Sequence, residues 1–265
     1  MRDTCDGLVL REAPYGENDK LITVLTADEG KLLFTAKGAR SMRSKTMPLC
    51  RLFTYANFEF YEKNGHRWLS GGSVTDNFHG INSDMEGFAL AAYIVQLAAE
   101  ITGEGVPCPE VLQMTLNTLY AIEQKLKPLP QIKAAYEIFA ANVSGFSPDL
   151  SGCGECEAEE SEGGWWLDVM NGRVVCAACF SQRNAGAVDA PSTDRFMTSN
   201  ILLPMDASAL AAWRYVSSAP LKRVFSFGLE SADSMRDLER TAETYILNHL
   251  ERGFEALDFY HTIKT

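Results

Sequence analysis

Four of the seven cysteines are spaced so that they could hold a metal ion. Cys153 and Cys156 belong to the segment CGEC, Cys176 and Cys179 belong to CAAC, and nineteen residues separate the two pairs. Each C-x-x-C turn brings two sulfur atoms to one point, and two such turns supply the tetrahedral set of thiolates that zinc prefers. Four thiolates leave no coordination position open for water or substrate. We therefore expect one structural Zn²⁺ per chain.

Two other uses of the paired cysteines stay open at this point. Disulfides are rare in a reducing cytosol, and a redox dithiol is usually found in a thioredoxin-like βαβ unit, which precedes neither motif. The remaining cysteines, Cys5, Cys50 and Cys108, stand alone in the sequence. Isolated cysteines of this kind are usually small buried apolar residues, and we expect no nucleophile among them.

A second group of residues with a common chemistry is the basic segment 30–58. The whole chain has 24 Lys and Arg against 35 Asp and Glu, a formal net charge of −11, yet this segment contains no acidic residue. Because a carboxylate would repel a phosphate at close range, we interpret the segment as a surface that binds the phosphates of nucleic acid. Its six cations are Lys31, Lys37, Arg40, Arg43, Lys45 and Arg51.

Alternative interpretations of this segment also stay open. A basic segment can bind RNA, anionic lipid or an acidic protein, or it can be a solvated loop with incidental charge. The neighbouring aromatic residues could stack on bases, but we favour the interpretation that they fill the interior of a small barrel. They are Phe53, Tyr55, Phe58, Phe60 and Tyr61.

The elements that must position these residues begin with β structure. Five short runs rich in Leu, Val, Ile, Thr and aromatic residues are separated by the turn signals APYGEND, DEG and KNG. Five such runs so close together predict a small closed β-barrel. They cover residues 7–13, 20–27, 30–37, 51–63 and 66–76.

Helical periodicity replaces the strand pattern from residue 84 onward. Asp84 can cap a first helix, Pro109 stands near the start of a second, and a third covers residues 131–143. Residues 145–195 lack a period and hold the paired cysteines. Further helical segments are expected at 206–218, around 221–227 and at 231–257. The predicted fold class is α+β, with a barrel domain at 1–80 and a helical domain at 81–265 that carries the zinc-binding insertion at about 145–195.

Several classes of protein are disfavoured by what the sequence lacks. No apolar run approaches the roughly 18 residues of a membrane span, and the N-terminus has no secretory signal, so we expect a cytoplasmic protein. The four histidines are scattered, and no deaminase motif, P-loop or clustered nuclease carboxylates are present. We therefore expect no enzymatic activity.

The most specific motif of the chain lies in its first quarter. GLVL, followed by GENDKLITVLTADEGKLLFTAKGARSMRSK, resembles the N-terminal region of the RecO family of bacterial DNA repair and recombination mediators. The later order of GFSPDLSGCGEC, CAAC and closing helices is similar to that family as well. The resemblance covers most of the chain and is weakest over its last part.

This resemblance implies a fold, a function and a set of partners. The barrel would be an oligonucleotide-binding (OB) fold that binds single- and double-stranded DNA and anneals complementary strands. With RecR, the protein would load RecA onto DNA coated by single-strand-binding protein, in the bacterial cytoplasm at the nucleoid. At the AKGAR motif, the resemblance assigns the DNA role to Lys37 and Arg40, with Arg43 and Lys45 continuing the basic loop, whereas Gly38 meets a backbone requirement.

The family also implies binding of the acidic C-terminal tail of single-strand-binding protein. Lys125, Lys127 and Lys133 flank the apolar residues Leu126, Leu129 and Ile132, a combination that suits an acidic peptide with an apolar end. A helix junction with solvated lysines is the alternative. For the whole chain, the competing hypothesis is a zinc-stapled protein–protein adaptor with no direct role in nucleic-acid binding.

Overall fold

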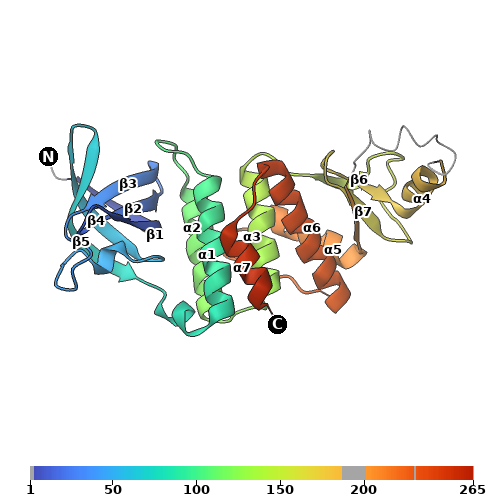
Figure 1. Cartoon of the computed structure of the whole chain (residues 1–265). Coiled ribbons are helices and arrows are strands. Elements are labelled where there is room, and N and C mark those ends of the chain that lie inside the picture. The colour runs from blue at the N-terminus through green and yellow to red at the C-terminus, as the bar shows by residue number, and fades with distance from the viewer. Residues whose placement is uncertain (1–2, 187–200, 230, 265) are drawn as a thin grey trace. The chain divides into compact units, whose positions relative to one another are not determined.

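The computed structural model describes residues 3–186, 201–229 and 231–264. The last part of the expected zinc-binding insertion, residues 187–195, lies outside these ranges. The chain forms two compact units, one of residues 1–129 and 254–265 and the other of residues 130–253 (Figure 1). The domain boundary expected near residue 80 stays a prediction.

The first unit begins with the closed five-stranded barrel that the sequence predicts. Its strands are β1 (Asp3–Tyr15), β2 (Asp19–Thr26), β3 (Gly30–Ala36), β4 (Tyr55–Lys63) and β5 (His66–Asp76). They follow the order β1-β2-β3-β5-β4, β1 pairs with β4 to close the barrel, and the β3–β5 pair is parallel. This is the OB-fold arrangement, in which a closed barrel leaves no unpaired sheet edge.

Alternation along the strands fills the barrel interior. Ile22 and Val24 from β2, Leu32 and Phe34 from β3 and Phe58 from β4 are all buried in one cluster. Residues of a strand at i and i+2 point to the same face, so this inward set follows directly from the alternating pattern. Phe34 packs on Phe58 with ring centroids 6.0 Å apart. Of the five aromatic residues expected to fill the barrel, Phe58 and Phe60 belong to this cluster, whereas Tyr55 and Tyr61 are only half-buried and Phe53 lies outside it.

The fourth strand starts later than expected. Residues 48–50 form a 3₁₀ helix, η1 (Pro48–Cys50), and β4 begins only at Tyr55. Phe53 takes a left-handed backbone conformation with φ 67°, and its N–H donates to the carbonyl of Val9 on β1 at 3.1 Å. A strand cannot continue through this conformation. The prediction of a strand from residue 51 was therefore wrong by four residues.

Three helices complete the first unit: α1 (Met85–Glu100), α2 (Pro109–Glu123) and α7 (Glu255–Ile263). A short 3₁₀ segment, η2 (His79–Ser83), leads from β5 into α1. The Asp84 carboxylate accepts hydrogen bonds from the N–H groups of Glu86 and Gly87, so the predicted cap of α1 is confirmed. Helix α1 packs against both α2 and α7.

The second unit combines helices with a small sheet. Its helices are α3 (Leu129–Val143), α4 (Ala177–Gly186), α5 (Ala207–Ser218) and α6 (Ala232–Leu250). Its sheet has the order β6-β8-β7-β9, from strands β6 (Asp149–Cys153), β7 (Trp165–Asp168), β8 (Arg173–Cys176) and β9 (Leu202–Met205). The expectation of an irregular region at 145–195 was wrong for β6, β7, β8 and α4. Four- and five-residue strands are too short to show a period, and α4, with the sequence AACFSQRNAG, has few apolar residues to mark one face.

Two helical predictions near the C-terminus were wrong. Residues 221–227 form turns and irregular backbone in place of a helix. The helix expected over 231–257 ends at Leu250, because Glu251 adopts a left-handed conformation with φ 50°, and α7 begins anew at Glu255. A left-handed residue after the last turn is a common way to end a helix. Among the described residues, no helix has both the length and the apolar character needed to cross a bilayer.

Candidate metal centre and nucleic-acid interface

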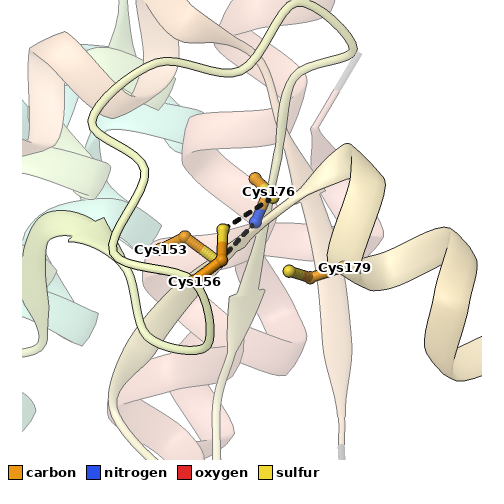
Figure 2. A group of neighbouring side chains, drawn as sticks. All are labelled: Cys153, Cys156, Cys176 and Cys179. Atoms are coloured by element: carbon orange, nitrogen blue, oxygen red, sulfur yellow. Dashed lines mark hydrogen bonds between the residues drawn. The ribbon is translucent and has the colours of Figure 1, made fainter.

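The four predicted cysteine ligands come together in the second unit. Cys153 ends β6, Cys156 lies in the turn that follows, Cys176 ends β8, and Cys179 lies in the first turn of α4. Their sulfur atoms all lie within 4.8 Å of one another (Figure 2). All seven cysteines are free thiols, so the paired cysteines do not form disulfides.

The spacing of these sulfurs fits a tetrahedral ion. The Sγ atoms of Cys156 and Cys176 are 3.7 Å apart. Four sulfurs at the zinc–thiolate distance of about 2.3 Å, at the corners of a tetrahedron, would be separated by about 3.8 Å. One sulfur–sulfur distance thus already matches a bound zinc ion, and the four sulfurs lie close enough together to hold one metal ion.

The protonation behaviour of the cluster also suits a cation. Burial opposes ionisation of Cys153, but backbone N–H groups, that of Cys176 foremost, lower its pKa to about 6. The N–H of Cys176 lies 3.3 Å from the Cys153 sulfur (Figure 2). The neighbouring thiols, first that of Cys156, raise the pKa of Cys179. One thiolate is thus stabilised by the fold, whereas a full set of thiolates needs an added positive charge.

Residues that the sequence did not single out hold the cysteine turns in place. Arg183 on α4 forms ion pairs with Glu155, between the first two cysteines, and with the buried Asp168 at 3.5 Å. The Arg173 guanidinium donates to the Gly154 carbonyl at 2.9 Å. A Cβ atom on Gly154 would lie 2.5 Å from the Arg173 side chain, so glycine is needed here for a close approach. The only sequence feature that could have pointed to this role of Arg183 is its position, four residues after the last cysteine.

The cations of the basic segment lie in two kinds of environment. Four of the six have exposed side chains and take part in no ion pair among the described residues: Lys37, Arg43, Lys45 and Arg51. The Lys37 ammonium lies 4.5 Å from the centroid of the Trp68 ring on β5. These four side chains are available to an external anion, as the interpretation of a phosphate-binding surface requires.

Lys31 and Arg40 are engaged within the protein. The Lys31 ammonium donates to the carbonyl oxygen of Ala99 at 2.5 Å, near the C-terminal end of α1, where a cation complements the helix dipole. The Arg40 guanidinium donates to the Glu17 carbonyl at 2.9 Å but remains exposed. Lys31 therefore tethers β3 to α1, whereas Arg40 can still reach a ligand with its free N–H groups.

One of the lysines expected to bind an acidic peptide is not accessible. The side chain of Lys133 is fully buried in the second unit and forms ion pairs with Glu137 at 2.8 Å and Glu243 at 2.5 Å. Ile132 is fully buried as well. The expectation that Lys133 and Ile132 line a peptide-binding surface was therefore wrong, because both side chains belong to the interior.

Comparisons with known proteins cover nearly the whole chain. The family model "Recombination protein O N terminal" matches residues 1–78, and "Recombination protein O C terminal" matches residues 82–258. The DNA repair protein RecO of Acetivibrio thermocellus is 26% identical over 258 residues, which are 97% of this chain and 95% of that protein. The DNA repair protein RecO of Anaeromyxobacter sp. strain K is 29% identical over 259 residues, with the same coverage. That of Listeria welshimeri is 31% identical over 182 residues, 68% of this chain and 69% of its own.

Proposed function

Because the chain belongs to the RecO family of DNA repair proteins, we propose that its barrel binds single- and double-stranded DNA through the backbone phosphates. The carboxylate-free loop between β3 and β4 is the observation that carries this proposal. It exposes four cations that form no ion pair with any residue the structure describes, and it presents Arg40 beside them. Contacts of this kind fix the position of a strand but do not read its sequence.

Binding without base readout suits the annealing of complementary strands. A protein that holds two strands by their phosphates lowers their mutual repulsion and leaves the base edges free to test pairing. We propose that the protein anneals strands in this way. With RecR, it would assist the loading of RecA onto DNA covered by single-strand-binding protein, whose acidic tail is a further proposed partner.

The metal centre has a structural role in this proposal. The four thiolates of Cys153, Cys156, Cys176 and Cys179 suit one Zn²⁺ per chain, and a four-thiolate set has no open position for a reacting ligand. Bound zinc would supply the positive charge that allows all four cysteines to ionise. Arg183 and Asp168 would then keep the helix and the sheet that carry the ligands in register.

The direct test is an annealing assay with fluorescent complementary strands, run with and without single-strand-binding protein. The protein should accelerate annealing both of free strands and of strands coated by single-strand-binding protein. Affinity for a single-stranded oligonucleotide should fall steeply with salt, with a log–log slope of about −0.7 for each phosphate neutralised. A flat salt dependence would refute the phosphate-binding surface and favour the adaptor hypothesis.

A further inference from the structure

A groove of about 700 Å³ lies in the first unit beside the basic loop. The β3–β4 loop, up to the residues directly before β4, forms one side, and the connection from β5 into α1 contributes the other. Its lining is chemically mixed, with exposed cations, amide side chains and a group of apolar residues. A volume of this size is typical of sites that enclose most of a small organic ligand.

One wall of the groove is aromatic and rigid. Phe53 is buried and holds its left-handed conformation because the backbone on either side is fixed to β1. Its own N–H donates to the Val9 carbonyl at 3.1 Å, and the Val9 N–H donates to the Thr54 carbonyl at 2.9 Å. Phe88 on α1 packs edge-on against Phe53, with ring centroids 5.6 Å apart, yet 36% of Phe88 remains exposed. A partly exposed aromatic ring on a fixed support offers a surface for stacking.

In contrast to this rigid aromatic wall, two methionines supply flexible side chains to the same groove. Met42 and Met47 also line it, and Met42 is 91% exposed. Methionine side chains are unbranched and polarizable, so they adapt to flat apolar groups of different outline. The groove can therefore accept an aromatic ligand without strict selection of its shape.

The charge of the groove favours an anionic ligand. Arg40 and Arg51 line it with exposed guanidinium groups, and Arg51 has no ion-pair partner among the described residues. The carboxylate among the lining residues, Glu12, is paired with Lys20. A ligand with a flat ring and an adjacent negative charge would match both parts of this lining.

We propose that this groove takes an unpaired nucleobase of single-stranded DNA, with the adjoining phosphate on Arg40 or Arg51. The inference rests on the proposed DNA-binding function and adds a base-binding subsite to it. Base–aromatic stacking tolerates every base because each has a π face. A base inside a duplex is already stacked and paired, so only an unpaired base enters without an added cost. The groove would thus give the barrel a preference for single strands.

The experiment compares an oligothymidylate with an abasic deoxyribose–phosphate chain of equal length, which carries the same charge but no bases. The wild-type protein should bind the oligothymidylate roughly tenfold more tightly than the abasic chain. Phe88→Ala should remove most of this difference and leave affinity for the abasic chain unchanged. Phe259→Ala is the matched control, because Phe259 is a 47% exposed phenylalanine on α7 that does not line the groove, and it should bind as wild type does.

The outcomes separate the two proposals. Equal, salt-dependent affinity of the wild-type protein for both chains would overturn the base-binding groove and leave backbone binding intact. Absence of salt-dependent binding to either chain would overturn the proposed function itself. The wild-type comparison needs no variant, so it stands even where Phe88→Ala impairs folding. Competition by an acidic peptide with an apolar end, together with equal affinity for the two DNA chains, would assign the groove to a protein partner and refute the proposal.

Discussion

The exposed pair Arg43 and Lys45 offers the sharpest test of the phosphate-binding surface. Both lie in the β3–β4 loop, both are exposed, and neither forms an ion pair or a side-chain hydrogen bond among the described residues. Replacing both by alanine removes two charges without disturbing the core. We expect the variant to keep the stability of the parent, since surface substitutions of this kind usually change it by less than about 0.5 kcal/mol.

The expected loss of affinity follows from counterion release. Each phosphate contact on a single strand contributes about 0.7 to the log–log salt slope, so the loss of two contacts should reduce the slope by about 1.4. If the two proteins bind equally at 1 M salt, this change corresponds to a loss of about 70-fold at 50 mM salt and about 10-fold at 200 mM. The effect should thus shrink as salt rises.

Fluorescence anisotropy with a labelled oligonucleotide over a salt series measures this slope. The matched control replaces Lys222 and Arg223 by alanine; these are also one exposed lysine and one exposed arginine, and they lie in the second unit. The control should keep the parental slope. An unchanged slope for the Arg43 and Lys45 variant, or an equal reduction in the control, would refute the assignment of DNA binding to this loop.

For Lys31, which belongs to the same basic segment, we predict the opposite result: a loss of stability with an unchanged salt slope. Lys31→Ala removes the hydrogen bond to the Ala99 carbonyl and should lower the free energy of unfolding by about 1 kcal/mol. The salt slope for DNA binding should stay as in the parent, because this ammonium is hydrogen-bonded to the end of α1 and is not available to a phosphate. A reduced slope at unchanged stability would show that Lys31 contacts phosphate after all.

Three further predictions concern the helices and the metal centre. Cys156→Ser should reduce zinc from one equivalent per chain to near zero and increase hydrogen exchange in the β6–β9 sheet, as measured by elemental analysis and mass spectrometry; full zinc retention would contradict the site. Asp84→Ala should cost about 1 kcal/mol in chemical denaturation. Burial opposes ionisation of Asp84, but the N–H of Gly87 and other partners lower its pKa below the ordinary value of 3.8. The cap therefore contributes its full stability above pH 3.8, and the difference between variant and parent should disappear as the pH falls through the lowered pKa of the folded state. Lys133→Met should cost about 3–5 kcal/mol by leaving buried carboxylates without their cation, and adding Glu137→Gln should restore part of it in the same denaturation experiment.

Local patterns predicted much of the fold and the metal centre. The alternation of Ile22 and Val24, the cap at Asp84 and the spacing of the cysteine pairs each depend on residues close together in the chain. The closed barrel, the hydrogen bonds that Asp84 accepts at the start of α1 and the clustering of the four cysteine sulfurs agree with these predictions. Short strands such as β9 escaped prediction, because β9 is held by pairing with β7, which lies far from it in the chain. The end of α6 at Glu251 was missed because a left-handed residue after a helix is usually glycine or asparagine, and a glutamate gives no such signal.

The sequence by itself determined which residue types are concentrated where: four cysteines in two turns, and a stretch of cations without carboxylates. Only the tertiary structure decided which of those charges face solvent. Lys31 meets a carbonyl 68 residues away, and Lys133 meets Glu243 110 residues away, whereas Arg43 remains exposed. Burial and pairing of a long side chain depend on what the fold brings beside it, and a local pattern carries no record of such distant neighbours.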